Sequence, residues 1–407
     1  MQRSLWLFAI VCFLLSLWIV VPAPNLFFLR LAVAAPEVSP LLGLLSAIAL
    51  ILALLKWRNS SEPYSPFTKD KRVRLSFIEA NTHKGLTSLL LVTLLLCSGP
   101  SLQRPGAIAA ANQSMADAFG QSSQVSAPFR WRTFFSGFTN ETVRIRRNIA
   151  FQSSAGVPLS LDLYQPSQPG RYPAVVTIYG GSWMRGNPAD CQQIAHFLAA
   201  RGYVVAALDY RHAPAHTFPD QVKDVAAGLA FVQNQADAFE IKRDRIALLG
   251  WSAGAHLAML LGFQLELQPD KPVRSIVNYH GPVDLTNGYY DIPQPDPIDV
   301  RQVLRAFIGG TPAELAAAYD AASPITYVEQ AAANTLPDTL LIYGGRDHVV
   351  ESRFGKSLHS ALQKSGNRAV WINIPWAEHA FDKLFSGTSN QMALPFIEEF
   401  LAQTLKR

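Results

Sequence analysis

One serine in this sequence stands in a setting that would make its hydroxyl group a nucleophile. Residues 248–256 read Leu-Leu-Gly-Trp-Ser-Ala-Gly-Ala-His, which places Ser252 between Gly250 and Gly254 in a G-x-S-x-G pattern. A buried-strand pattern precedes this stretch, and a helix pattern begins at Ala253. A serine on such a sharp turn exposes its hydroxyl group, and the two glycines let the strand and the helix approach closely. The pattern therefore predicts a nucleophile elbow at Ser252.

A serine hydroxyl group needs a neighbouring base to take its proton before it can attack a carbonyl carbon. Asp347 follows the strand pattern at 340–343, and His379 follows the strand pattern at 369–374. Functional groups in parallel sheets gather at the carboxyl ends of the strands, so we expect both side chains to reach Ser252. His379 would then act as the general base, and Asp347 would orient its imidazole ring.

Other side chains compete for these two roles. Glu351 and Glu378 are alternative acids, but Asp347 has the better position directly after its strand. His256 lies one turn into the helix that follows the serine, and we expect it to be a packed helix residue.

A metal site is a further alternative, since His212 and His216 lie near Asp209 and Asp220. Polar contacts within a loop are the commoner use of such residues, so we expect no metal. Cys191 is the only cysteine in the globular part, and we expect a buried or helix-surface thiol there.

A glycine pair supplies candidate donors for the charge that would develop on a substrate oxygen. Residues 179–183 read Tyr-Gly-Gly-Ser-Trp and follow another buried-strand pattern. We expect the oxyanion hole to consist of the loop residues Gly180, Gly181 and Ser182 together with the amide of Ala253.

Strand and helix patterns alternate through the second part of the chain. Strands are predicted at 143–151, 157–164, 174–179, 203–208, 246–249, 274–279, 340–343 and 369–374, with helices at about 188–200, 219–239, 353–365 and 391–405. This alternation predicts an α/β fold with a mostly parallel, doubly wound sheet. We assign residues 140–407 to the catalytic domain and residues 282–330 to a cap or pocket wall.

The first hundred residues differ sharply from the rest. They hold three apolar runs, at 5–21, 41–55 and 86–98. We expect a membrane region at 1–100 with two or three transmembrane helices, because the third run is short for a span. A signal peptide is the alternative for the first run.

Charge divides in the same way. Residues 1–139 hold 12 Lys and Arg against 5 Asp and Glu, whereas residues 140–407 hold 23 against 25. The larger domain therefore lacks the excess of basic residues that is expected of a nucleic-acid-binding protein.

Basic residues at 56–84 predict a cytoplasmic loop and a cytoplasmic N-terminus. The catalytic domain would then be exoplasmic or periplasmic if 86–98 spans, and cytoplasmic if it does not. Residues 101–139, rich in Ala, Ser, Gln and Gly, are predicted to be a linker.

Taken together, these motifs resemble those of α/β-hydrolase esterases of the hormone-sensitive-lipase-like and feruloyl-esterase-like groups. The matching segments are Tyr179 to Trp183, Asp209 to Arg211, Phe218-Pro219, Asp224, Gly250 to Ala258, Ala322 to Ile325, Gly344 to Asp347 and His379 to Phe381. The resemblance covers about 145–405. It implies an α/β-hydrolase fold, a serine carboxylic-ester hydrolase acting on a small-molecule ester, and no cofactor. The N-terminal part looks like a membrane anchor added to this fold.

Three positions depart from the family pattern. Tyr179 replaces the usual loop histidine, Ser182 replaces the third glycine, and Trp251 replaces the aspartate of the hormone-sensitive-lipase-like elbow. The last difference brings the chain closer to feruloyl-esterase-like and arylformamidase-like relatives. An amidase or arylformamidase with the same residues, and a non-catalytic membrane-attached protein, therefore stay open as alternatives. The sequence also leaves the natural substrate and the oligomeric state open.

Overall fold

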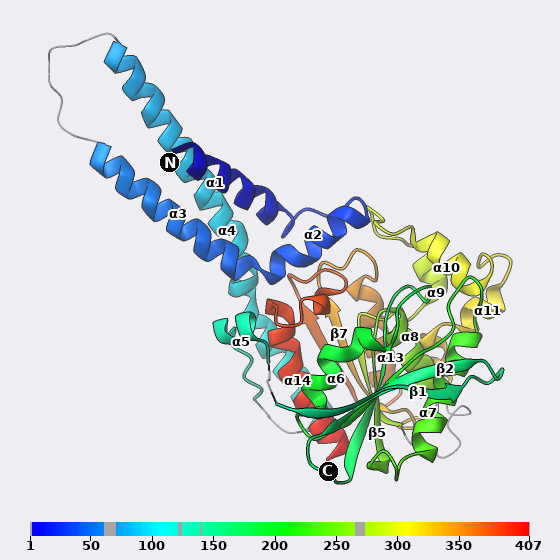
Figure 1. The fold of residues 1–407 in the computed structure, drawn as a ribbon. Helices are drawn as coiled ribbons and strands as arrows, with labels where there is room; N and C mark the ends of the chain where they lie inside the picture. The colour runs from blue at the N-terminus through cyan, green and yellow to red at the C-terminus, as the bar shows by residue number, and fades with distance from the viewer. Residues whose placement is uncertain (1, 61–70, 121–123, 139–140, 265–272, 407) are drawn as a thin grey trace. The chain divides into compact units, whose positions relative to one another are not determined.

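The chain folds into two compact units, which are residues 1–105 and residues 106–407 (Figure 1). The computed structural model describes residues 2–60, 71–120, 124–138, 141–264 and 273–406.

The N-terminal unit is helical. Its helices are α1 (Gln2–Leu17), α2 (Leu26–Glu37), α3 (Ser39–Ser60) and the first part of α4 (Lys71–Phe119). By length and composition, the stretches Ser39–Arg58 and Thr82–Phe119 could each cross a membrane. They contain the second and third apolar runs of the sequence.

The first apolar run forms a shorter helix than predicted. α1 ends at Leu17, so the helix has 16 residues and falls short of the roughly 20 that a bilayer requires. Pro22 and Pro24 follow closely, and a proline disfavours helical backbone in the residue before it. The next helix, α2, was not predicted; its N-cap is Asn25, whose side chain accepts two backbone hydrogen bonds at 3.1 and 3.2 Å.

The structure also differs from the predicted linker at 101–139. α4 continues to Phe119, and the short helix α5 (Trp131–Ser136) follows. Alanine is the strongest helix former, and Ala107, Ala111 and Met115 repeat at a four-residue spacing that buries one helix face in the core of the second unit. Of the basic residues on which the predicted topology partly rests, Lys69 lies outside the described residues, and Lys71, Arg72 and Arg74 are described in their backbone only.

The second unit is built on one eight-stranded sheet with the strand order β1-β2-β4-β3-β5-β6-β7-β8. The strands are β1 (Val143–Gln152), β2 (Pro158–Pro166), β3 (Tyr172–Ile178), β4 (Val204–Leu208), β5 (Ile241–Trp251), β6 (Val273–Tyr279), β7 (Asp338–Gly344) and β8 (Ala369–Ile374). β2 pairs in antiparallel fashion with β1 and with β4, and all other neighbours pair in parallel. The predicted, mostly parallel sheet is confirmed.

The register of the sheet brings the ends of five strands to one edge. Ile178 pairs with Gly250, Trp251 pairs with Tyr279, and Gly344 pairs with Ile374. The residues directly after β3, β5, β6, β7 and β8 are therefore neighbours in space, as expected for the carboxyl edge of a parallel sheet.

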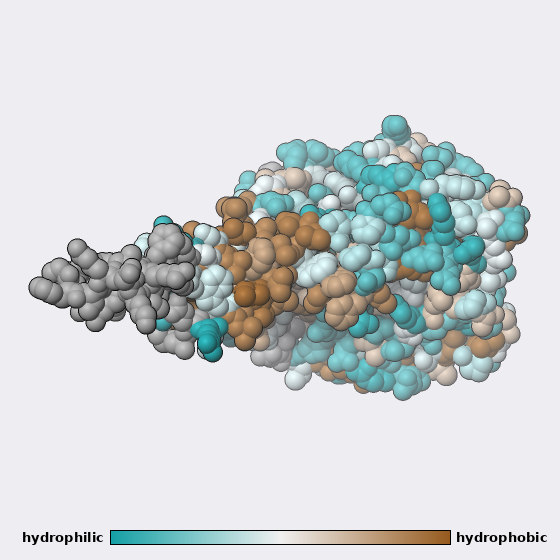
Figure 2. Space-filling view, turned by 90° about the horizontal axis from the view of Figure 1, so that it is seen from above, coloured by the Kyte–Doolittle hydropathy of each residue, from teal (hydrophilic) through white to brown (hydrophobic). Residues whose placement is uncertain are grey.

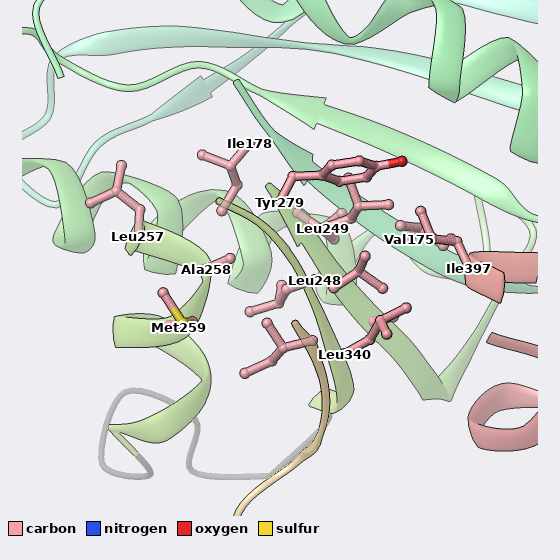
Figure 3. Close-up of a cluster of buried hydrophobic side chains, with 14 of the residues drawn as sticks. Val175, Ile178, Leu248, Leu249, Leu257, Ala258, Met259, Tyr279, Leu340 and Ile397 are labelled. Carbon is pink, nitrogen blue, oxygen red and sulfur yellow. The ribbon is translucent and has the colours of Figure 1, made fainter. Parts of the chain in front are cut away.

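Helices cover both faces of this sheet (Figure 1). The α-helices that pack on the strands are α6 (Gln192–Ala199), α7 (Asp220–Asn234), α8 (Ala253–Phe263), α13 (Ser352–Lys364) and α14 (Thr388–Leu405). The other helical segments are η1 (Pro188–Cys191), α9 (Leu285–Tyr290), α10 (Val300–Ile308), α11 (Ala316–Ala321), α12 (Pro324–Gln330) and η3 (Phe381–Lys383). In Figure 3, Leu257 and Met259 of α8 lie on one side of the central strands, and Ile397 of α14 lies on the other. Strand residues such as Leu248 and Leu340 between them are fully buried, which holds the carboxyl edge rigid.

Candidate active site

Ser252 occupies a strained turn between β5 and α8. Its backbone has φ 49° and ψ −118°, and its amide donates a hydrogen bond of 2.9 Å to the carbonyl oxygen of Tyr279. A non-glycine residue with positive φ is uncommon, and such strain clusters at functional sites. The flanking glycines are required by close approach, since a Cβ atom on Gly254 would overlap the carbonyl oxygen of Ile178, and one on Gly250 would overlap the backbone of Gly254.

Three predicted residues come together at the carboxyl edge as a hydrogen-bonded row. Nε2 of His379 lies 3.0 Å from Oγ of Ser252, and Nδ1 of His379 lies 2.8 Å from Oδ2 of Asp347. Asp347 and His379 are both buried, and they follow β7 and β8 respectively. These are the distances and the order that proton transfer from a serine to a supported imidazole requires.

Asp347 is fixed by its own loop. Its Oδ1 atom accepts hydrogen bonds from the amides of Val349 and Val350, at 2.8 and 2.7 Å, which leaves Oδ2 directed at His379. Burial by itself lowers the pKa of His379, but the charge and the hydrogen bond of Asp347 outweigh burial, so the pKa of His379 lies above its ordinary value. The site therefore favours the protonated imidazole that forms when a serine gives up its proton.

Glu378, one of the rival acids, joins the two loops instead of facing the imidazole ring. Its Oε1 atom accepts the backbone amides of His348 at 2.7 Å and of His379 at 3.0 Å. Its Oε2 atom lies 2.6 Å from Nδ1 of His348, and this hydrogen bond raises the pKa of His348. The other rival, Glu351, pairs with Arg353 on the surface. Only Asp347 bonds the ring of His379 among the described carboxylates.

The loop after β3 lies against the elbow. Gly181, Ser182 and Trp183 all have positive φ, at 146°, 57° and 59°. A Cβ atom on Gly180 would stand 2.6 Å from the carbonyl oxygen of Trp251, so only glycine fits beside the elbow at this position. The backbone is thus held in an uncommon shape next to Ser252.

Several amides of this region have no partner within the described chain. Neither Gly181 nor Ser182 donates a backbone hydrogen bond there, and the amide of Ala253 opens helix α8, where the first amides have no intrahelical acceptor. Free amides beside a nucleophile are suited to binding a developing oxyanion. Their role as the oxyanion hole stays a prediction.

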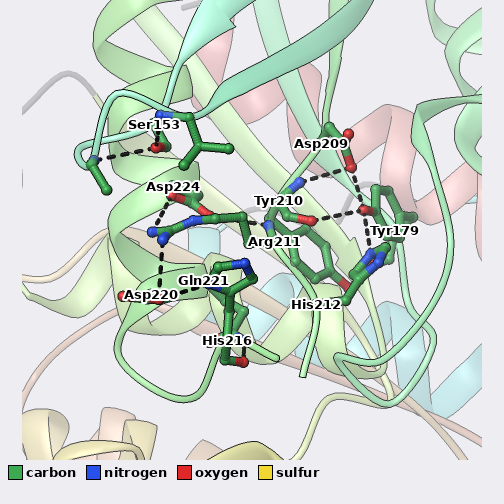
Figure 4. Close-up of polar contacts among 12 residues, drawn as sticks. Ser153, Tyr179, Asp209, Tyr210, Arg211, His212, His216, Asp220, Gln221 and Asp224 are labelled. Carbon is green, nitrogen blue, oxygen red and sulfur yellow. Dashed lines mark hydrogen bonds and ion pairs between the residues drawn. The ribbon is translucent and has the colours of Figure 1, made fainter. Parts of the chain in front are cut away.

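Tyr179, which stands where the sequence resemblance would have a histidine, anchors the same loop (Figure 4). The hydroxyl group of Tyr179 lies 2.5 Å from Oδ1 of Asp209 and 2.9 Å from Nε2 of His212, so it donates to the carboxylate and accepts from the imidazole. Burial raises the pKa of Tyr179, which keeps the phenol neutral. In return, the hydroxyl group of Tyr210 donates to the backbone oxygen of Tyr179 at 3.1 Å.

The side chains considered for a metal site are engaged in this network and its neighbour. Arg211 bonds both carboxylate oxygens of Asp224 at 2.8 Å, and it also reaches Asp220 at 3.0 Å. His216 lies 3.3 Å from the same oxygen of Asp220. Figure 4 shows these groups directed at one another, which assigns them to fixing the loop after β4.

His256 packs in the helix as predicted and also has a contact that the sequence did not indicate. Its Nδ1 atom accepts from the indole of Trp183 at 3.2 Å, and its Nε2 atom donates to the backbone oxygen of Ala322 at 2.7 Å. Burial lowers the pKa of His256 to about 4, so the ring stays neutral and keeps both roles. His256 thereby connects the loop after β3 to the predicted cap segment. Trp183 of this loop also stacks on Phe307 of the cap segment.

A small apolar pocket opens onto the serine. Its cavity volume is about 60 Å³. The lining comes largely from the predicted cap segment and includes Ser182, Trp183, Ser252, Val283, Leu285, Val300, Val303, Leu304, Val349, Val350 and Phe354. A larger, polar cleft of about 1030 Å³ shares Val283 and Phe354 with this pocket. The serine therefore faces a narrow apolar space that adjoins a wide polar one.

The sequence patterns do not predict the place of two groups near the row. Glu378 appears there only as a rival acid, although its position beside His379 is a signal that it could connect loops. His280 belongs to none of the predicted motifs, although it directly follows β6 and so lies at the same edge as Ser252. Its position after a buried strand was the available signal.

Comparison with known proteins agrees with this architecture. The model of the BD-FAE family matches residues 161–362. The probable carboxylic ester hydrolase LipM of Mycobacterium tuberculosis is 30% identical over 246 residues, covering 58% of this chain and 55% of LipM. The isoprenylcysteine alpha-carbonyl methylesterase ICME of Arabidopsis thaliana is 34% identical over 224 residues, covering 52% and 51%. The chain thus spans about half the length of the curated relatives it matches.

Solved structures match over more of the chain. The hyperthermophilic esterase from the archaeon Pyrobaculum calidifontis has a TM-score of 0.56 and 22% identity, covering 74% of this chain and 92% of the esterase. The carboxylesterase EstE1 from a metagenomic library has a TM-score of 0.55 and 22% identity, covering 76% and 98%. At this identity the likeness concerns the fold. The second unit of this protein has the α/β-hydrolase fold.

Proposed function

We propose that this protein is a membrane-anchored serine carboxylic-ester hydrolase that works through an acyl-enzyme. The observation that carries the proposal is the hydrogen-bonded row from Asp347 through His379 to Ser252, with the serine on a strained turn. The names of the curated relatives, a carboxylic ester hydrolase and a methylesterase, support the same class of bond.

In the first half of the reaction, Oγ of Ser252 attacks the carbonyl carbon of the ester, and Nε2 of His379 takes the hydroxyl proton. Asp347 stabilises the imidazolium ion that results. The negative oxygen of the tetrahedral intermediate accepts hydrogen bonds from the amide of Ala253 and from the loop of Gly180, Gly181 and Ser182. When the intermediate collapses, the bond to the alcohol oxygen breaks, and this oxygen receives the proton from His379.

In the second half, water attacks the acyl group on Ser252. Nε2 of His379 takes a proton from the water, a second tetrahedral intermediate forms, and the carboxylic acid leaves as the proton returns to Oγ. The enzyme is regenerated with no cofactor.

The pocket limits the part of the substrate that it can hold. Its volume of about 60 Å³ and its apolar lining suit a short aliphatic group, because deeply bound ligands commonly need several hundred Å³. The adjoining cleft is polar and wide enough for the remainder of the ester. We therefore propose esters in which one side of the scissile bond is short and apolar.

The surface of the N-terminal unit supports membrane attachment. Twenty of the 27 large hydrophobic side chains that lie exposed in the described chain belong to residues 1–105. Figure 2 shows this hydrophobic surface on the N-terminal helices, whereas the visible face of the second unit is mostly hydrophilic. A large exposed apolar surface indicates a partner that covers it, and stretches of spanning length make a bilayer the fitting partner.

Hydrolysis of p-nitrophenyl esters from acetyl to palmitoyl by the full-length protein tests the proposed activity, with Ser252→Ala as the inactive reference. We expect activity on the short esters and its loss by at least about 10³-fold in Ser252→Ala. Equal rates for the two proteins would refute the serine mechanism. Serine-dependent turnover of matched amides or formamides in preference to esters would replace the esterase by the amidase alternative.

Alkaline carbonate extraction of membranes tests the anchor. We expect the full-length protein to stay in the pellet, because the apolar helices are inserted in the bilayer. Release into the supernatant would contradict the anchor and leave the hydrolase proposal standing. Protease added outside intact cells should remove a tag at the C-terminus if the catalytic unit is exoplasmic or periplasmic, and protection of the tag would place the unit in the cytoplasm.

A further inference from the structure

A second acid–histidine pair lies beside the proposed catalytic base. Nε2 of His280 lies 2.9 Å from Oδ1 of Asp382, and the rings of His280 and His379 are 4.4 Å apart between centroids. His280 follows β6, and Asp382 lies in η3, three residues after His379. This arrangement has no part in the proton transfers described above.

The pair is largely buried, and hydrogen bonds hold each of its two residues in place. His280 is 1% exposed, and the side chain of Asp382 is 11% exposed. The backbone amide of His280 donates to the carbonyl oxygen of Ile342 in β7 at 2.8 Å, and Asn390 donates to the backbone oxygen of Asp382 at 3.2 Å. Neither residue can move away from His379 without breaking these contacts.

The hydrogen bonds define the charge of the pair. The carboxylate of Asp382 accepts, so Nε2 of His280 carries the proton, while Nδ1 has no partner among the described residues. A second proton on His280 would be a buried donor without an acceptor, next to His379. Burial lowers the pKa of His280, and His379 lowers it further. Burial is the largest single effect on the pKa of Asp382 and raises it, but the hydrogen bond from His280 and the nearby charges of His280, Lys383 and His379 together leave it below the ordinary value.

In this pair His280 is therefore neutral, and Asp382 is a buried anion. Such an anion is costly to bury, and the exposed Lys383 is the positive group near it in the resting site. A positive charge arises beside it when His379 takes the proton of Ser252. We propose that Asp382 and His280 act as positioning residues that hold His379 in place and stabilise its protonated form during the reaction. This inference rests on the proposed esterase mechanism.

Other charged groups also face His379, and the effect of Asp382 and His280 on the protonated imidazole is additional to theirs. They are Asp347, which bonds Nδ1, and Glu378, which accepts the backbone amide, whereas the exposed Lys383 acts on Asp382. Asp347 and Glu378 act on the nitrogen and the backbone of His379. The ring of His280 lies directly beside the ring of His379, tilted by 59°.

The test is the pH profile of kcat/KM for full-length protein on p-nitrophenyl acetate. Asp382→Asn keeps an acceptor for His280 and removes the charge. We expect a fall of about tenfold on the plateau and an acid limb displaced to lower pH, because the imidazolium ion loses support. His280→Phe keeps ring packing but isolates Asp382, which then becomes neutral, so the same two changes are expected. The double variant should be no worse than either single variant, since the residues act as one unit.

Two control variants lie away from the row. His359→Phe alters another buried histidine, on α13, and Asp338→Asn alters another paired carboxylate, at the start of β7. Both should keep the acid limb of the unaltered protein. An unmoved limb in Asp382→Asn, with or without loss of rate, would overturn the inference and leave a structural role only. If that variant does not fold, the limb of His280→Phe decides in the same way. Absence of serine-dependent hydrolysis in the unaltered protein would instead overturn the proposed function.

Discussion

Nε2 of His379 lies 3.0 Å from Oγ of Ser252, although 127 residues separate the two in the sequence. The sheet makes this possible, because the strands that precede them end at the same edge. Asp347 bonds the other ring nitrogen, Nδ1, and so orients the imidazole with Nε2 toward the serine, as proton transfer requires.

Replacing the carboxylate by an amide tests this support. Asp347→Asn keeps the size of the side chain but no longer fixes the tautomer or balances the imidazolium charge. We expect kcat to fall by about 10³- to 10⁴-fold with little change in KM. Steady-state kinetics on p-nitrophenyl acetate measure both values. A loss below tenfold would show that another group supports His379, and Glu351→Gln is the matched surface control.

The pH dependence follows from the raised pKa of His379. The base must be neutral to accept a proton, so activity is lost as the pH falls through its pKa. Because Asp347 and its hydrogen bond raise this pKa above the ordinary value of about 6.5, the acid limb of kcat/KM should lie above that pH. A profile from pH 5 to 9 measures it, and a limb well below pH 6 would contradict the assigned environment of His379.

Glu378 should matter for stability and rate together. In Glu378→Ala, the buried amide of His379 and the partly buried amide of His348 lose their shared acceptor, and an unsatisfied buried amide costs about 1–3 kcal/mol. We expect Tm to fall by about 5 °C or more and kcat to fall with it, because both loops loosen. Glu398→Ala is the control, since Glu398 is half exposed and pairs with Arg201 at the surface. Equal Tm values for the two variants would remove Glu378 from this role.

The small pocket should set the chain-length preference. We expect acetyl and propionyl esters to react faster than octanoyl and longer ones. Leu304→Ala widens the pocket and should raise the ratio of kcat/KM for butyryl over acetyl esters by about tenfold, in line with the effect of a methylene group in an apolar pocket. Leu315→Ala, at an exposed leucine, should leave the ratio unchanged. A preference for long chains in the unaltered protein would show that the pocket does not hold the acyl group.

The sequence predicted the sheet well because buried parallel strands are continuous apolar runs, and the residues after them must share an edge. The same argument predicted that Ser252, Asp347 and His379 lie together. The sequence did not predict the helix over 101–119, because Ala and Gly there were interpreted as linker composition, while the four-residue spacing of Ala107 and Ala111 indicated a packed face.

Contacts between loops that are distant in the sequence could not be predicted for a different reason. Asp382 and His280 are 102 residues apart, and nothing in either segment specifies the other. The same holds for His256 and Trp183, whose hydrogen bond depends on how the loop after β3 folds back. Pairs of this kind follow from tertiary packing, which local patterns do not encode.

The central claim is that Ser252 is the nucleophile, and covalent labelling tests it most directly. The full-length protein would be treated with a fluorophosphonate, which bonds to activated serine hydroxyl groups, and the labelled peptide would be identified by mass spectrometry. We predict one adduct, on Ser252, with its formation abolished in Ser252→Ala and strongly slowed in His379→Gln. An adduct on another serine, or none on the folded protein, would contradict the assignment.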